Sequence, residues 1–438
     1  MRPRYDGFAR QLMKESYNIQ PLIPEVGVIA LVPDTWGGPW QPRHQVLTRL
    51  ANYFQVAWVN PSLGWRRLWF EKEKAKTNLS QPLISNFFHF SIYPQELWFP
   101  KLYRLPRVNK WMLHQRLDRI IKKLKRNGCQ KIILYVWRPK FADALDAMQF
   151  DLRCYHIDDD YTFSENDKPM SSLEVKILRE VDVAFIHSSG LMKKKASFAR
   201  KVFHIPNGVD YQAYATQRDE PSDISIIPHP RIGYVGWLKA QLDLELFLTL
   251  VKRHTDWSFI FIGPAQQTEY MRKWIRQIST FSNVYMLGEQ PVDRLPAYTQ
   301  ALDVCLMNYK VNAYTNSIYP LKLHEYLATG KPVVGAPIQS VIPFGDVVKL
   351  ARSDEEWSQA ISESLSPSLN TVEATQTRQS IAKKYDWNSL VFSVAHAMCE
   401  GLGPSYLEQL HRNKIIIPFP SCQETSEHDR DEFSLATS

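Results

Sequence analysis

The sequence has few cysteines and no pairing pattern among them. Its 438 residues include five cysteines, an odd number, and none belongs to a CxxC pair. They lie far apart in the chain, at Cys129, Cys154, Cys305, Cys399 and Cys422. This spacing excludes a disulfide framework and a zinc-knuckle signature, and it is typical of a protein of the reducing cytoplasm.

Long hydrophobic runs are also absent. Nowhere do about 18 uncharged apolar residues follow one another, so we expect no membrane-spanning helix. The first 20 residues lack the apolar segment of a signal peptide. With 44% hydrophobic and 22% charged residues, the composition is that of a folded protein, and its length predicts two domains.

Charge is distributed unevenly along the chain. Residues 1–210 contain 33 Lys and Arg against 20 Asp and Glu, whereas the remainder contains 20 against 25. A basic half joined to a mildly acidic half suggests two domains with different partners. Basic patches bind nucleic acids, anionic membranes or phosphate-bearing substrates, and charge alone does not choose among these partners.

Short apolar runs alternate with helical patterns in both halves of the chain. Strands are expected in the first half at Val26–Val32, Gln55–Val59, Lys131–Trp137, Leu152–Ile157, Val181–His187 and Val202–Pro206. In the second half they are expected at Arg231–Val235, Ser258–Ile262, Val284–Leu287, Val304–Asn308 and Pro332–Ala336. Helices are expected between them at Gln45–Tyr53, Trp111–Arg126, Ser172–Glu180, Leu242–His254 and Leu321–Thr329. The alternation predicts an α/β fold with two tandem Rossmann-like, doubly wound domains that face a central cleft.

Composition suggests where the domains begin and end. We expect an N-terminal extension at 1–24, an N-terminal domain at 25–210, a linker rich in Pro and Ser at 211–230, a C-terminal domain at 231–386, a helix packing back across the cleft at 387–411, and a polar tail at 412–438. Parallel sheets bind ligands at the carboxyl ends of their strands, so the cleft is the expected site. This pattern alone suits a dehydrogenase, a kinase or a transferase.

One helix in the second half has the features of an anion site. Pro320 stands where a first helical turn begins, and Gly330 is suited to a helix end. The helix N-terminus would offer free N–H groups and a positive dipole to an anion. Lys322 and Glu325, three residues apart on one face, could meet a diphosphate and ribose hydroxyls, respectively. A solvated Lys–Glu pair is the simpler reading of the chemistry alone.

The pattern P-L-K-x-x-E-Y-L-A-x-G-K-P-V-V around these residues resembles the donor-site motif of the family-four-like, group 1 retaining glycosyltransferases. It is most similar to the branch of teichuronic-acid-type polysaccharide transferases. Further pieces occur in the same order, at Trp36–Arg43, Tyr155–Tyr161, Asp182–Ser189, Ile205–Asp210, and Ile232–Trp237 with Asp243. The resemblance spans roughly residues 26–400 and implies the glycosyltransferase-B architecture, with the donor site in the second domain.

The resemblance also implies roles for individual residues. Its donor-binding positions are Gly236, Lys239, Ser317, Leu321, Lys322 and Glu325. Its acceptor-side positions are Gly37, Gly38, Arg43 and His187, and its catalytic positions are Asp159, Asp160 and Lys322. A carboxylate in the Asp158–Asp160 run could take the proton of an acceptor hydroxyl, or it could cap a helix or be solvated. For His187, which ends a buried strand, a hydrogen-bonded structural histidine is the favoured reading and a direct ligand is the alternative.

The sequence departs from the family pattern at several donor-side positions. Ser317 stands where the family has the first of two glutamates, the one that contacts the donor sugar. Trp237 and Leu242 stand where many relatives carry Arg and Lys. Lys239 and Lys322 are therefore the cations left to meet a diphosphate, and Lys322 is the stronger candidate because its helix dipole also favours an anion.

These observations predict a hexosyltransferase-type enzyme that moves a sugar from a nucleoside diphosphate sugar to a hydroxyl acceptor. We expect no cofactor and no metal, an acceptor that is a surface glycan or is lipid-linked, and peripheral attachment to the inner face of an anionic membrane through the basic half. A nucleotide-sugar epimerase on the same fold is the nearest alternative. A nucleic-acid-binding protein is the alternative of a different class, but no helix-turn-helix, zinc-finger or RNA-binding signature supports it.

Overall fold

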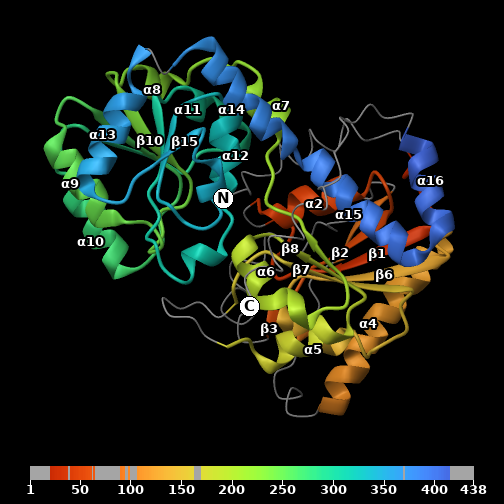
Figure 1. The fold of residues 1–438 in the computed structure, drawn as a ribbon. Helices are drawn as coiled ribbons and strands as arrows, with labels where there is room; N and C mark the ends of the chain where they lie inside the picture. Colours follow the sequence, from red (N-terminus) through yellow and green to blue (C-terminus); the bar gives the residue numbers. More distant parts are fainter. Residues whose placement is uncertain are drawn as a thin grey trace, which may run out of the picture.

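The computed structural model describes residues 20–37, 40–61, 63–64, 89–93, 97–98, 106–161, 169–367 and 370–414. It contains two parallel sheets, and helices cover both faces of each sheet (Figure 1). The α/β fold with two Rossmann-like domains is therefore confirmed. Within the described residues, no helix is both long and apolar enough to span a membrane.

The first sheet has seven strands in the order β4-β2-β1-β6-β7-β8-β9, and all neighbours are parallel. The strands are β1 (Val26–Leu31), β2 (Gln55–Val59), β4 (Phe90–Tyr93), β6 (Lys131–Val136), β7 (Leu152–Ile157), β8 (Val183–Ile186) and β9 (Val202–His204). A two-residue parallel pair joins β3 (Leu63–Gly64) to β5 (Leu97–Trp98). The strand order reverses between β1 and β6, where doubly wound sheets place their ligands.

Alternate side chains of β1 enter two different cores. Val28 and Ala30 pack on one face with α2 (Pro42–Leu50), whereas Ile29 and Leu31 pack on the other face. That second face is covered by α4 (Pro106–Arg126), α5 (Ser172–Glu180) and α6 (Ser189–Lys195). Both faces of the strand are thus buried, as the uninterrupted apolar run predicts.

The second sheet has six parallel strands in the order β12-β11-β10-β13-β14-β15. They are β10 (Arg231–Val235), β11 (Ser258–Ile262), β12 (Val284–Gly288), β13 (Val304–Met307), β14 (Val333–Gly335) and β15 (Val348–Leu350). The helices α9 (Leu244–Arg253), α10 (Glu269–Ile278) and α13 (Asp354–Ser364) cover one face. The other face is covered by α11 (Leu295–Gln300), α12 (Leu321–Ala328) and α14 (Val372–Lys384).

The chain crosses between the two domains twice, and the crossings lie side by side. The amide of Val209 donates to the carbonyl of Tyr385, and the amide of Trp387 donates to the carbonyl of Val209, both at 3.0 Å. Arg49 on α2 pairs with Asp210 at 3.1 Å beside these crossings. One short patch of backbone pairing therefore joins both connections between the domains.

Three expected elements differ in the structure. The segment expected as one helix at 387–411 is two helices, α15 (Trp387–Leu402) and α16 (Pro404–Lys414), because Gly403 adopts a φ of 124° between them. The expected linker at 211–230 contains α7 (Tyr211–Ala215) and α8 (Ser222–Ser225), and its apolar side chains join the second core. Helix α2 begins at Pro42 rather than at Gln45. Most of the expected extension, residues 1–19, and the tail from residue 415 lie outside the described residues.

α15 returns to the N-terminal domain after the second crossing. Val391, Val394 and Met398 are fully buried in the core that β1 and α2 share. Figure 1 shows α15 lying along the first sheet beside α2. The end of the chain thus completes the domain that the start of the chain began.

The carboxyl ends of β10 and β11 meet at glycines with left-handed backbone, Gly236 (φ 141°) and Gly263 (φ 135°). A Cβ at Gly263 would overlap the carbonyl of Gly236. We therefore expect Gly263→Ala to lower the free energy of unfolding by about 2–4 kcal/mol, through backbone strain and steric overlap. Gly345→Ala is the control, because Gly345 has a φ of −56° and a Cβ there has room. Equal midpoints for both variants in urea unfolding would contradict this reading.

Candidate active site

A cavity of ≈ 490 Å³ lies where the two domains meet. The N-terminal domain contributes the first turn of α2 with Gln41, and the crossing region contributes Asp210 and Tyr214. The C-terminal domain contributes Gly236 after β10 and the first turns of α12. It also contributes Val292 and Asp293 of the short helix η4 (Val292–Arg294), and Leu295 and Pro296 after it. The cavity therefore lies at the carboxyl edge of the second sheet, where the fold places ligands.

Helix α12 begins at Leu321 as expected, ends at Ala328, one residue before the expected Thr329, and points its N-terminus into this cavity. Pro320 is its N-cap with φ −68° and ψ 127°, and Gly330 follows its end with φ 75°. Leu321, Lys322 and Glu325 all line the cavity, as the sequence predicts for one face of the helix. The first turn of a helix has N–H groups without intrahelical partners, and together with the helix dipole these groups favour an anion.

Lys322 is held in a space that only glycine leaves open. A Cβ at Gly236 would overlap the Lys322 ammonium, which also lies 5.2 Å from the centre of the Tyr234 ring. Burial lowers the pKa of Lys322 to about 8; Glu325 opposes this shift and Lys239 adds to it. At neutral pH the side chain is thus charged but poorly solvated, a state that a bound anion would stabilise.

Glu325 lies one turn further along the same face. Burial raises the pKa of its carboxyl group, and Lys322 and a hydrogen bond from Tyr214 oppose the shift. Tyr214 belongs to α7, in the segment expected as a linker, and no local pattern in the sequence indicates its role. The site therefore includes a residue that only the crossing between domains brings into place.

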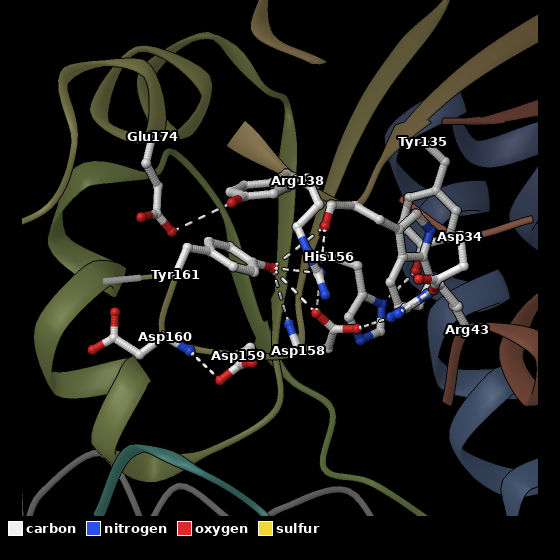
Figure 2. A network of polar contacts seen from close by, with 12 residues as sticks. Asp34, Arg43, Tyr135, Arg138, His156, Asp158, Asp159, Asp160, Tyr161 and Glu174 are labelled. Atoms are coloured by element: carbon white, nitrogen blue, oxygen red, sulfur yellow. Dashed lines mark hydrogen bonds and ion pairs between the residues drawn. The ribbon is translucent and has the colours of Figure 1, made fainter. Parts of the chain in front are cut away.

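The three adjacent aspartates after β7 have three different surroundings (Figure 2). Asp158 lies between Arg43, at 2.6 Å, and Arg138, and these cations hold the pKa of its carboxyl below the usual range despite burial. Asp160 accepts a hydrogen bond from Lys194 at 3.1 Å. Among the described residues, no group of three or more His, Cys, Asp or Glu is placed to hold a metal ion.

Asp159 lies outside the cavity lining and makes a hydrogen bond to the other domain. Its Oδ1 accepts a hydrogen bond from the hydroxyl of Tyr314 at 3.0 Å. Burial and the neighbouring charge of Asp158 raise the pKa of Asp159 to about 6. A carboxylate with that pKa is largely ionised at neutral pH and can accept a proton, the property required of a general base.

Several other expected site residues are placed differently. Arg43 is buried and engaged by Asp34 and Asp158, so it does not face the cavity as a free acceptor-side cation. The hydroxyl of Ser317 donates to the carbonyl of Ala313 at 3.1 Å, and Ser317 does not line the cavity.

The remaining expected residues lie outside the cavity lining or outside the described residues. His187 is buried at the end of β8, and burial lowers its pKa to about 4. The ammonium of Lys239 lies 5.0 Å from the Trp237 ring, outside the cavity lining. Gly37 has open space around it, and Gly38 lies outside the described residues.

Three consecutive lysines, Lys193–Lys195, read in the sequence as an exposed cation cluster, but the structure places them otherwise. Lys195 has no exposed surface and pairs with Glu174 at 2.6 Å, while Lys194 pairs with Asp160. Glu174 and Asp160 are distant from the lysines in the sequence, so the sequence alone gives no sign of these pairs. Two of the three lysine charges therefore point inward rather than to solvent. Those two charges support the aspartate loop instead.

Comparison with known proteins agrees with this geometry. Residues 229–367 match the sequence profile of the family described as glycosyl transferases group 1. This segment is a group 1 glycosyltransferase domain. It contains α12 with Lys322 and Glu325, as well as Gly236 and the cavity residues of η4 and α11.

One relative and two solved structures extend the comparison beyond the group 1 domain. The chain is 28% identical over 234 residues to TuaH of Bacillus subtilis (strain 168), a candidate teichuronic acid biosynthesis glycosyltransferase, covering 51% of this chain and 58% of that protein. Anabaena HepE in complex with UDP has a TM-score of 0.60 at 15% identity, over 86% of this chain and all of HepE. An Escherichia coli trehalose-6-phosphate structure with bound UDP-2-fluoro glucose has a TM-score of 0.61 at 12% identity, over 84% and 98%. The fold is thus the expected glycosyltransferase-B architecture.

The electrostatics of the cavity lead to a direct test. Because Glu325 raises the pKa of Lys322 and Lys239 lowers it, Glu325→Gln should bring that pKa below about 8, whereas Lys239→Met should raise it. The ammonium then loses its charge at a lower pH in the first variant and at a higher pH in the second. NMR titration of ¹³Cε-labelled lysine, with Lys322→Arg to assign the signal, measures both shifts. If the pKa of Lys322 shifted in the same direction in both variants, Glu325 and Lys239 would not have opposite effects on Lys322, and this reading would be wrong.

Proposed function

We propose that the protein transfers a sugar from a nucleoside diphosphate sugar to a hydroxyl group of a glycan or lipid-linked acceptor, in the biosynthesis of a surface polysaccharide. The observation that carries this proposal is the cavity in which Lys322 and Glu325 meet at the N-terminus of α12, inside the group 1 domain. The UDP named in the HepE complexes supports a nucleotide donor. The relationship to TuaH supports a polysaccharide product.

On the donor side, the leaving group is a diphosphate whose negative charge grows as the glycosidic bond breaks. Helix α12 offers backbone N–H groups and the positive end of its dipole, and Lys322 offers an ammonium beside them. Glu325 would accept hydrogen bonds from ribose hydroxyls. We propose that these groups suffice to stabilise the leaving diphosphate and that the enzyme is a metal-independent hexosyltransferase.

On the acceptor side, Asp159 would take the proton of the attacking hydroxyl. The acceptor oxygen forms a bond to the anomeric carbon, the bond from that carbon to the diphosphate breaks, and the hydroxyl proton passes to the Asp159 carboxylate. Its pKa of about 6 leaves the carboxylate ionised at neutral pH. We also propose retention of the anomeric configuration, which rests on the resemblance to retaining enzymes. In a single displacement, retention requires the acceptor oxygen to attack from the same face of the sugar that the diphosphate leaves.

Release of nucleotide from nucleotide sugars, measured by mass spectrometry with and without membrane extract, tests the function. Lys322→Ala should lower turnover by roughly 10²–10³, because its ammonium acts mainly on the transition state. Glu325→Gln should weaken nucleotide binding by about tenfold or more, the effect of one lost charged hydrogen bond. Lys252→Ala, at an exposed lysine of α9 in the same domain, is the control and should change neither.

The same assay separates the alternatives. Activity in excess EDTA is expected, and complete loss that Mn²⁺ restores would contradict metal independence. Analysis of the sugar product distinguishes transfer from epimerisation, because an epimerase leaves a free or nucleotide-bound epimer and no new glycosidic bond. Unchanged turnover in Lys322→Ala would place that lysine outside the chemistry.

We also propose peripheral attachment of the N-terminal domain to an anionic membrane through α4. This helix carries eight Lys and Arg residues and a single acidic residue, Asp118. Trp111, with 62% of its surface exposed, shares the outer face of the helix with Lys122 and Lys125, while Leu117 and Leu124 face the core. An exposed tryptophan beside cations suits a bilayer surface. The sequence also mixes aromatic residues and cations at Trp65–Phe70, a further candidate for membrane contact that lies outside the described residues.

Liposome flotation tests this attachment. Binding is expected with anionic but not with neutral vesicles and should weaken at high salt, because each cation near the surface contributes about 1 kcal/mol that salt screens. The double variant Lys122→Glu/Lys125→Glu should reduce binding by more than about tenfold on the same grounds. The matched control is Lys383→Glu/Lys384→Glu, which reverses two exposed charges on α14 of the other domain. Equal loss in both double variants would show a net-charge effect and no docking surface on α4.

A further inference from the structure

The stretch of chain that leads into α12 is held by the opposite domain. We name residues 314–320 the approach segment, since α12 follows it directly. The carbonyl of Ser317 accepts a hydrogen bond from the Ser188 hydroxyl at 2.6 Å, and the carbonyl of Tyr319 accepts one from the Asn207 side chain at 2.7 Å. Alternate carbonyls of the approach segment are therefore satisfied by side chains of the N-terminal domain.

Two more contacts join the approach segment to the N-terminal domain. Tyr314 donates to Asp159 at 3.0 Å, and Gly190 lies so close to the backbone of Asn316 that a Cβ there would overlap its carbonyl. Ser188 has no exposed surface and Asn207 has 8%. A buried carbonyl that loses its donor stays unsatisfied, because water does not replace the lost partner. These buried hydrogen bonds therefore favour the observed contact between the domains more strongly than exposed hydrogen bonds would.

Helix α12 itself does not need these contacts for its own packing. Leu323, Tyr326 and Leu327 are fully buried in the core of the C-terminal domain, on the side of the helix away from the cavity. The contacts to the approach segment therefore set where the N-terminal domain lies relative to α12, while the nucleotide cavity keeps its main groups without them.

We propose that Ser188 and Asn207 are positioning residues: through the carbonyls of Ser317 and Tyr319 they hold the N-terminal domain against the start of α12, so that Asp159 and Lys322 face one substrate. This inference rests on the proposed function for its effect on turnover. The contact itself can be tested without any substrate.

The chain offers a matched control for Ser188. Ser188 caps α6 by accepting from the amide of Leu191 at 3.2 Å, and Ser171 caps α5 by accepting from the amide of Glu174 at 3.2 Å. Both caps support the pair between Lys195 and Glu174, one through each partner. The Ser188 hydroxyl also donates across the domain boundary at 2.6 Å, so Ser188→Ala loses a hydrogen bond between domains that Ser171→Ala keeps intact. The two sites also differ in burial, because Ser188 has no exposed surface and Ser171 is exposed.

Hydrogen–deuterium exchange of the full-length protein and steady-state kinetics form the test. In Ser188→Ala and in Asn207→Ala, exchange in residues 314–320 should rise by about threefold to tenfold, the factor that one hydrogen bond of ordinary strength sets. Turnover should fall by a similar factor. Affinity for UDP, measured by calorimetry, should stay within about twofold, because the nucleotide cavity shares no partner with these residues. Ser171→Ala should change neither exchange in the approach segment nor turnover.

Each outcome decides between readings. Equal effects of Ser188→Ala and Ser171→Ala would overturn the proposal, because helix capping alone would then account for the loss. A parallel fall of UDP affinity and turnover would also overturn it, since the residues would then belong to the donor site. If the unaltered protein binds no nucleotide and transfers no sugar, the proposed function fails, while the exchange measurement still decides whether the two hydrogen bonds hold the domains together.

Discussion

The loop that follows β7 depends on the ion pairs of one buried carboxylate, Asp158. Arg43 reaches it from the start of α2 and Arg138 from the end of β6, so the ends of three neighbouring elements converge on one charge (Figure 2). A buried carboxylate without these partners would be strongly destabilising. With them, the loop after β7 has a fixed course, and its next residue, Asp159, is directed toward the other domain.

The cavity at the start of α12 depends on the absence of a side chain at Gly236. Gly236 follows β10 with a left-handed backbone, and the space that its absent Cβ leaves is occupied by the Lys322 ammonium. Any larger residue there would move the lysine away from the start of α12. The strand end, the helix start and the cation therefore form one unit, and the group 1 segment at 229–367 contains all of it.

Local pattern in the sequence predicts most strands and the donor helix, because each depends on residues near one another in the chain. Lys322 and Glu325 are found from their spacing on one helix face. Interactions between distant segments have no such signal: Lys195 reads as part of an exposed cation run until the fold brings Glu174 to it. The edge strand β4 (Phe90–Tyr93) has only four residues and mixed burial, too little for a pattern to predict it.

Burial shifts the pKa values of the two candidate reacting groups in opposite directions, because it favours the neutral form of each group. It raises the pKa of Asp159 to about 6, with Asp158 adding to the shift, and lowers the pKa of Lys322 to about 8, with Lys239 adding to it. The carboxylate is ionised above the first value and the ammonium is protonated below the second. Both charges therefore coexist between about pH 6 and pH 8, where an acceptor proton can be taken while a leaving diphosphate is stabilised. Because each group belongs to a different domain, the proposed transfer would need the domains to meet as closely as the approach segment holds them.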